Sequence, residues 1–240
     1  MQYDIAKMGF VKRHWLLNSS NIPHRFIGLG PDDVKSYLGS FADEIEDWLQ
    51  DVLEGKVVKN IGGIGTTGVG LLFDGVAGLG KTTHSVICLT ELIRRLPEDQ
   101  TDGAKLLGYK REDYSVAARP VYYMTVPDFI NRKKAMIDAD PDSRREMQIQ
   151  MDGFHGRAKM DHLNVRVLVL DDLGKEPKSE YNVAGFDELL RSRYDKGLPT
   201  IVTTNLDREQ WKGKYGDAMG SFVYEAFNRV IIGNKDLRRN

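Results

Sequence analysis

The 240-residue sequence predicts an α/β fold in which helices cover both faces of a parallel β-sheet. Short apolar runs alternate along the chain with longer helical patterns, which is typical of parallel sheets whose strands are buried on both sides. A glycine-rich loop joins the first of these runs to a helix, and an acidic pair ends the third. Both features therefore lie where open α/β sheets bind ligands.

The expected elements follow in chain order. Residues 1–30 are interpreted as an N-terminal arm that could dock on a partner, and residues 31–240 as the main domain. In the arm, Trp15 has two possible places, on a partner protein or folded back onto the core. A helix is expected at residues 41–53, with Ser40 as its cap. The strands are then expected at 69–73, 121–125, 165–170 and 200–203. The helices are expected at 80–96, at 127–162 with a break near Pro141, at 183–196 and at 207–232, and a polar loop is expected at 97–119.

Composition excludes several classes of protein. The chain has 34 Lys and Arg against 35 Asp and Glu, so any nucleic-acid contact needs a local patch rather than overall charge. The single cysteine, Cys88, excludes an internal disulfide and a thiolate metal cluster, and it favours a reducing compartment such as the cytoplasm. No apolar run approaches the roughly 18 residues of a membrane span, and the first residues lack the apolar core of a secretory signal.

The loop at 75–82 predicts nucleotide binding. Its sequence, GVAGLGKT, fits the pattern G-x-x-x-x-G-K-[ST] and lies between an expected strand and an expected helix. Glycines let main-chain N–H groups turn toward a phosphate, and the following helix adds the positive end of its dipole. Lys81 is expected to reach the β- and γ-phosphates, and the Thr82 hydroxyl to bind Mg²⁺. The predicted contacts are Gly75, Val76, Ala77, Gly78, Leu79, Gly80, Lys81, Thr82 and Thr83. His84 and Cys88, further along that helix, are interpreted as packing residues.

An acidic pair, Asp171 and Asp172, follows the third expected strand. An apolar strand that ends in carboxylates is the second half of a site for nucleoside triphosphates. Asp171 is expected to hold Mg²⁺, through water or Thr82, and Asp172 to polarise the attacking water, which favours hydrolysis over binding alone. Asn205, after the fourth strand, is a candidate for orienting that water. The alternative is that Asn205 caps the helix that begins near residue 207.

Several segments, in this order, resemble one family. Over roughly residues 20–240 the chain resembles the AAA+ ATPases of the DnaC/DnaI helicase-loader and IstB transposition-helper group. The segments that carry the resemblance are IPHRF at 22–26, the loop at 75–82, LVLDDLG at 168–174, RYDKGLPTIVTTNL at 193–206, FNRV at 227–230 and DLRR at 236–239.

The resemblance implies a P-loop NTPase core of the ASCE type. Its five-stranded parallel sheet would have a strand inserted between the two catalytic strands, and no full C-terminal lid domain would follow. The implied cofactors are ATP and Mg²⁺, and the implied assembly is a ring or spiral. Asn205 would be the sensor-1 residue and Arg229 the arginine finger offered to a neighbouring subunit. Arg238, or equally Arg239, would be the sensor-2 contact to the nucleotide. Independently of the resemblance, the helical spacing of apolar groups at 222–227 predicts that Phe222, Val223 and Phe227 face the core and that Arg229 lies near a helix end.

Other functional classes fit the residues less well. A GTPase would need a residue between Lys235 and Asp236 in its guanine-reading motif, and none is present. A small-molecule kinase would need an acceptor-binding lid after the second expected strand, where no obvious one follows. A nucleotide-binding scaffold without turnover would need a broken site, whereas the whole set of catalytic residue types is present.

The partners are implied by the resemblance. A helicase loader would bind a replicative DNA helicase and single-stranded DNA, and an IstB-like transposition helper is the alternative that the sequence leaves open. Residues 127–162 contain seven basic and seven acidic residues, so they form either a solvated helical face or a pore-facing edge that follows DNA phosphates. Lys175, Lys178 and Tyr181 form a second candidate DNA edge.

Overall fold

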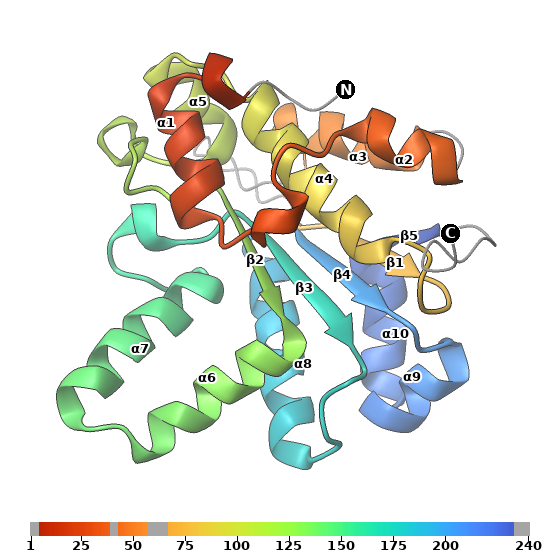
Figure 1. The fold of residues 1–240 in the computed structure, drawn as a ribbon. Helices are drawn as coiled ribbons and strands as arrows, with labels where there is room; N and C mark the ends of the chain where they lie inside the picture. The colour runs from red at the N-terminus through yellow and green to blue at the C-terminus, as the bar shows by residue number, and fades with distance from the viewer. Residues whose placement is uncertain (1–4, 39–42, 57–66, 233–240) are drawn as a thin grey trace.

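A five-stranded parallel sheet forms the centre of the fold. The computed structural model describes residues 5–38, 43–56 and 67–232. The strand order is β2-β3-β4-β1-β5, and the strands fan across the middle of Figure 1. Since β4 lies between β1 and β3, the predicted sheet with its inserted strand is confirmed. The strands are β1 (Gly70–Asp74), β2 (Val121–Thr125), β3 (Val167–Leu173), β4 (Thr200–Thr204) and β5 (Phe227–Ile231).

Helices cover both faces of this sheet, as predicted. Neighbouring strand residues point to opposite sides. Leu71 and Phe73 pack with α3 and α4 in one core cluster, and Leu72 packs with α9 and α10 in the other. The helices are α1 (Phe10–His14), α2 (Pro31–Leu38), α3 (Asp43–Leu53), α4 (Lys81–Arg95), α5 (Gln100–Leu107), α6 (Val126–Asp138), α7 (Pro141–Phe154), α8 (Glu180–Asp195), α9 (Arg208–Tyr215) and α10 (Asp217–Ala226). Among the described helices, none is long and apolar enough to cross a membrane.

The N-terminal arm packs against the core and covers a sheet edge. Trp15 is fully buried, and its Nε1 donates to the Ser115 carbonyl oxygen at 2.9 Å. Trp15 therefore packs on the core of its own chain, which is one of the two positions that the sequence left open. The Tyr123 N–H donates to the Ser20 carbonyl at 2.8 Å, and the Asn21 side chain donates to the Tyr123 carbonyl at 2.9 Å. These two bonds occupy the outer edge of β2, which is the first strand of the sheet.

The expected polar loop at 97–119 is wrong in part, because it contains helix α5. Asp99 caps α5 by accepting from the N–H groups of Thr101 and Asp102, and Gly108 ends it in a left-handed conformation (φ +66). The pattern misled because Gly103 interrupts the helical periodicity. A Cβ at Gly103 would lie 2.1 Å from the Tyr114 ring, so this glycine is required for close packing rather than for a turn.

The end of the chain also differs from the prediction. The expected helix at 207–232 is two helices, α9 and α10, followed by strand β5. Arg229 therefore lies close to the end of α10, as predicted, but on strand β5 and not on the helix. Phe222, Val223 and Phe227 are buried, as predicted. Only two of the five β5 residues are buried, so the segment lacks the continuous apolar run that marks the other strands.

The remaining elements lie close to their expected positions. β2 matches at both ends, α6 and α7 meet at the predicted break, and α3 covers most of the expected helix at 41–53. The proposed cap Ser40 lies outside the described residues, as do Lys235, Asp236, Arg238 and Arg239.

Candidate active site

The glycine-rich loop connects β1 to the N-terminus of α4. Gly75, Gly78 and Gly80 have φ values of +151, +90 and +80, which residues with a Cβ rarely adopt. Gly80 offers no capping side chain, so the first N–H groups of α4 remain available to an anion. The Lys81 ammonium lies within the loop, where it donates to the carbonyl oxygens of Gly75 at 2.6 Å and Val76 at 2.7 Å.

Two further residues of α4 have packing roles. His84 and Cys88 are both buried in the core beneath the sheet. Burial lowers the pKa of His84, and its Nδ1 lies 3.0 Å from the Gly80 carbonyl oxygen. Burial raises the pKa of the Cys88 thiol far above its usual range, so the thiol stays protonated. Neither residue lines the cleft beside the glycine-rich loop, in agreement with the sequence interpretation.

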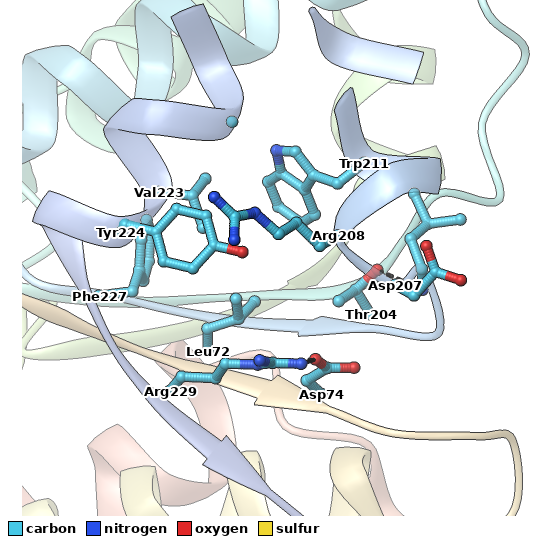
Figure 2. Close-up of a pocket in the computed structure, with 12 residues that line it drawn as sticks. Leu72, Asp74, Thr204, Asp207, Arg208, Trp211, Val223, Tyr224, Phe227 and Arg229 are labelled. Carbon is cyan, nitrogen blue, oxygen red and sulfur yellow. Dashed lines mark hydrogen bonds and ion pairs between the residues drawn. The ribbon is translucent and has the colours of Figure 1, made fainter. Parts of the chain in front are cut away.

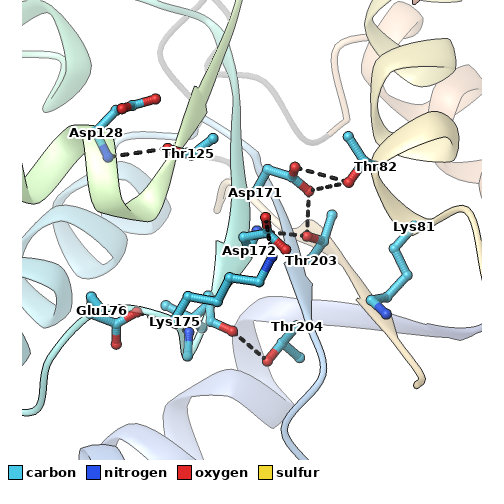
Figure 3. A network of polar contacts seen from close by, with 12 residues as sticks. Lys81, Thr82, Thr125, Asp128, Asp171, Asp172, Lys175, Glu176, Thr203 and Thr204 are labelled. Atoms are coloured by element: carbon cyan, nitrogen blue, oxygen red, sulfur yellow. Dashed lines mark hydrogen bonds and ion pairs between the residues drawn. The ribbon is translucent and has the colours of Figure 1, made fainter. Parts of the chain in front are cut away.

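Asp171 lies at the centre of a buried polar cluster, drawn in Figure 3. Its carboxylate accepts from the hydroxyls of Thr82 (2.9 and 3.0 Å), Thr203 (2.5 Å) and Tyr123 (2.7 Å). Burial and the charge of Asp171 raise the pKa of Tyr123 well above its usual range, so this phenol remains a donor. Carboxylate and hydroxyl oxygens are the ligands that Mg²⁺ prefers, and the contact between Thr82 and Asp171 brings one of each together.

Asp172 faces away from this cluster, toward the cleft beside the glycine-rich loop. It has a left-handed backbone (φ +63), at an irregularity in the pairing of β3 with β4 between Leu170 and Leu173. Its N–H donates to the Thr203 hydroxyl at 2.9 Å, and its carboxylate lies 2.7 Å from the Lys175 ammonium. One third of the Asp172 side chain is exposed, whereas Asp171 is buried. The two neighbouring carboxylates therefore have different environments, which suits different roles.

A cleft of about 470 Å³ gathers most of the predicted site residues. Asn205 reaches it from the loop after β4, and Asp207 rather than Asn205 caps α9, in a capping box with Gln210. Arg25 and Phe26 also line the cleft, with the guanidinium 4.6 Å from the ring centre. Both belong to the IPHRF segment at 22–26, to which the sequence alone assigns no role in the site. The lining residues are Arg25, Phe26, Ala77, Gly78, Gly80, Lys81, Thr82, Thr83, Asp172, Lys175 and Asn205.

Arg229 is separate from this cleft. Its Nε donates to Asp74 at 2.8 Å, and a second guanidinium nitrogen bonds the same carboxylate. Figure 2 shows this pair below the side chains of Trp211 and Tyr224 from α9 and α10. The Arg229 side chain is 45% exposed on edge strand β5. It is thus available to a neighbouring molecule more than to the nucleotide cleft of its own chain.

Several of the candidate DNA residues have partners within the chain. Arg144 donates to three carbonyls at the C-terminal end of α6, and Arg157 pairs with Glu188 at 2.7 Å. Lys133 lies over the Tyr181 ring, 4.8 Å from its centre, and burial lowers the pKa of this lysine. Lys178 donates to the Gly213 carbonyl. These contacts are those of a solvated helical surface, and they leave the alternative of a DNA-facing edge to experiment.

Comparisons with known proteins agree with this geometry. Residues 121–226 match a family of IstB-like ATP-binding proteins. An insertion sequence ATP-binding protein of Sinorhizobium fredii is 31% identical over 94 residues, which cover 37% of this chain and 38% of that protein. The predicted resemblance to the AAA+ DnaC/DnaI and IstB group is confirmed. The matched region includes Asp171, Asp172 and Asn205, while the phosphate loop is recognised by its own motif.

Two solved structures share the fold. The crystal structure of DnaI superimposes with a TM-score of 0.53 at 18% identity, over 88% of this chain and 94% of that one. The replication initiator DnaA, bound to AMPPCP and single-stranded DNA, gives a TM-score of 0.50 at 15% identity, over 84% of this chain and 50% of that one. At these identities the likeness concerns the fold, which is that of a P-loop NTPase.

Proposed function

We propose that this AAA+ chain binds ATP with Mg²⁺ in the cleft beside the glycine-rich loop and hydrolyses it. The observation that carries the proposal is the contact between Thr82 and Asp171, at 2.9 Å, at the edge of a cleft that also holds Lys81, Asp172 and Asn205. The loop and the acidic pair are 89 residues apart in sequence. Their meeting at the carboxyl ends of the parallel strands supports a single site for nucleotide and metal.

Each residue has a distinct part in the proposed reaction. Lys81 would leave the loop carbonyls and bind the β- and γ-phosphates, because phosphate oxygens carry full charge and carbonyls do not. Thr82 and Asp171 would hold Mg²⁺, which when bound neutralises charge on the phosphate oxygens. Asp172 would accept a hydrogen bond from the attacking water, and Asn205 would orient that water from the other side of the cleft.

The proposed assembly is a ring or spiral in which Arg229 acts across subunits. The side chain is half exposed on an edge strand and does not line the cleft of its own chain. A guanidinium is always charged and has a fork of donors that matches phosphate oxygens. In the assembly, Arg229 would exchange Asp74 for the γ-phosphate bound by a neighbour.

The proposed biological role is that of a DNA replication helicase loader that binds a replicative helicase and single-stranded DNA. A second role, transposition helper, is favoured by a specific observation. Both sequence matches, the IstB-like family and the insertion sequence protein, point to it. A purified replicative helicase and a purified transposase from the same genome should be compared as stimulators of ATP turnover. Stimulation by the transposase alone would overturn the loader and support the helper.

The ATPase proposal is tested with three proteins. The wild type should bind ATP and release phosphate slowly, and Lys81→Ala should lose ATP binding because the phosphates lose their direct cation. Asp172→Asn should keep ATP affinity and lose turnover, because the amide no longer polarises water. Affinity is measured by titration and turnover by phosphate release. Unchanged affinity in Lys81→Ala would contradict the site, and wild-type turnover in Asp172→Asn would contradict the role of Asp172. Binding without turnover in the wild type would indicate a nucleotide-binding scaffold.

A further inference from the structure

We propose that Glu176 is a positioning residue for ATP hydrolysis, which acts by fixing the turn that follows Asp172 at the end of β3. The inference rests on the proposed function and concerns a residue outside the predicted site. Glu176 lies four residues after Asp172, in the segment that leaves β3 (Figure 3), and it is 6% exposed. A buried carboxylate is costly unless its oxygens are well paired, so the contacts around Glu176 indicate its purpose.

The carboxylate of Glu176 joins its own loop to helix α9. One oxygen accepts from the Gly174 N–H at 2.9 Å, which closes a tight turn. The other oxygen accepts from the Tyr215 hydroxyl and lies 3.1 Å from the Lys214 ammonium. Burial, and then the hydrogen bond to Glu176, raises the pKa of Tyr215 far above its usual range, so the phenol remains a donor.

Lys214 strengthens the same connection through the main chain. Its ammonium donates to the carbonyl oxygens of Gly174 at 2.6 Å and Glu176 at 2.7 Å. Its side chain is 15% exposed, so these charge-assisted bonds are shielded from water. Helix α9 thus holds both ends of the turn from Gly174 to Glu176.

The fixed turn bears directly on the geometry of Asp172. Asp172 and Gly174 both have positive φ, +63 and +103, and the aspartate adopts this conformation against its preference. Such a conformation persists only where the surrounding structure holds it. The bonds from Lys214 and Glu176 hold the residues immediately after Asp172, so they define the direction in which its carboxylate points.

The same network reaches the loop that carries Asn205. The Thr204 hydroxyl donates to the Leu173 carbonyl at 3.0 Å, and a Cβ at Gly174 would lie 2.8 Å from the Leu206 side chain. The two loops are therefore packed without space between them. α9, which begins at Arg208, is the element that Glu176 binds. Glu176 consequently keeps Asp172 and Asn205 at a constant separation across the cleft.

The test compares Glu176→Gln, Tyr215→Phe and the matched control Glu180→Gln with wild type. Glu180 is an exposed carboxylate at the start of α8, outside this network. In Glu176→Gln we expect ATP affinity to stay as in wild type and kcat to fall by about 10- to 100-fold, the loss that small displacements of catalytic groups cause. Tyr215→Phe, which removes only one hydroxyl, should fold even if the Gln variant does not, and should show a smaller fall in kcat.

A second measurement separates positioning from general stability. Hydrogen–deuterium exchange of the peptide that contains residues 171–176 should be faster in Glu176→Gln and Tyr215→Phe, and unchanged in Glu180→Gln. Unchanged exchange, or faster exchange with wild-type kcat, would overturn the proposal. A wild-type chain without turnover would instead refute the proposed function, together with the reaction that Glu176 is proposed to serve, and it is recognised before any Glu176 variant is made.

Discussion

Arg193 offers a quantitative test of how the sheet is held together. Its side chain is fully buried and makes five hydrogen bonds. It contacts the Thr200 hydroxyl and four carbonyl oxygens at the end of α7 and at the amino ends of β3 and β4, which are those of Phe154, Val165, Arg166 and Pro199. These contacts lie at the end of the sheet opposite Asp171 and Asp172. A defect here should therefore affect stability and not catalysis.

Arg193→Met keeps much of the apolar stem and removes every donor. The Pro199 carbonyl retains the Leu168 N–H at 3.3 Å, so at least part of its hydrogen bonding survives. Hydrogen bonds from a charged donor contribute about 1.5–3 kcal/mol each, so losing those to the other three carbonyls should cost at least about 4.5 kcal/mol. For a domain of this size, that lower bound corresponds to a fall in Tm of about 9–18 °C. Arg193→Lys should be intermediate, because an ammonium cannot reach carbonyls on so many sides.

Calorimetry and urea unfolding would measure this effect, with Arg191→Met as the control on the same helix. Arg191 pairs with Asp187 at 2.9 Å, lies 4.4 Å from the centre of the Phe222 ring and is 41% exposed, so its loss should cost about 1 kcal/mol. ATP affinity of Arg193→Met, measured well below its Tm, should equal that of wild type. Equal Tm values for the two variants would refute the reasoning, since they would show that the buried hydrogen bonds contribute no more than an exposed ion pair.

Three further outcomes are expected. Arg229→Ala and Lys81→Ala should each be inactive alone and recover part of the ATPase activity when mixed, because one interface then pairs an intact loop with an intact arginine. Wild-type activity in Arg229→Ala alone would exclude the arginine finger. With ATP present, the assembled protein should bind a labelled single-stranded oligonucleotide of any sequence at low salt and release it as salt rises. An anisotropy titration without binding at low salt would remove DNA from the partners. Burial and then the charge of Arg157 lower the pKa of His155 from 6.5 to about 4, so the neutral imidazole is favoured in the folded state. The unfolded chain then takes up a proton that the folded chain does not, and unfolding free energy should fall as pH drops from 6.5 toward 4, by up to about 3 kcal/mol. Urea unfolding of His155→Gln over this range should show a weaker pH dependence, and an identical one would contradict this origin.

The features that were predicted correctly are those with short-range patterns. The loop at 75–82 lies within one strand–turn–helix unit, and β2 is a compact apolar run between polar segments. β5 was missed because only Phe227 and Val230 of its five residues are buried, so its sequence has no continuous apolar run. α5 was missed because the helical periodicity contains Gly103, whose purpose, contact with Tyr114, is visible only in three dimensions.

Within the site, the residues that contact Asp171 could not be predicted, because they are distant from it in sequence. Asp171 was recognised from the strand that precedes it, whereas the hydroxyls that surround it come from Tyr123 and Thr203, 48 and 32 residues away. The sheet order, and not a sequence motif, brings them together. Glu176 was missed because a single acidic residue in a loop suggests a solvated surface, and its burial depends on α9, which follows much later in the chain.

The bonds from Ser20 and Asn21 to the outer edge of β2 have a consequence for how this protein can be shortened. An uncovered edge strand offers unpaired N–H and C=O groups to other chains and is a common start of aggregation. The arm fills that position with the Ser20 carbonyl and the Asn21 side chain, while Trp15 buries its indole in the adjacent core. A fragment that starts at Pro31 would lose both protections at once. Residues 10–30 therefore act as a part of the folding unit, and a soluble minimal fragment should begin before Phe10.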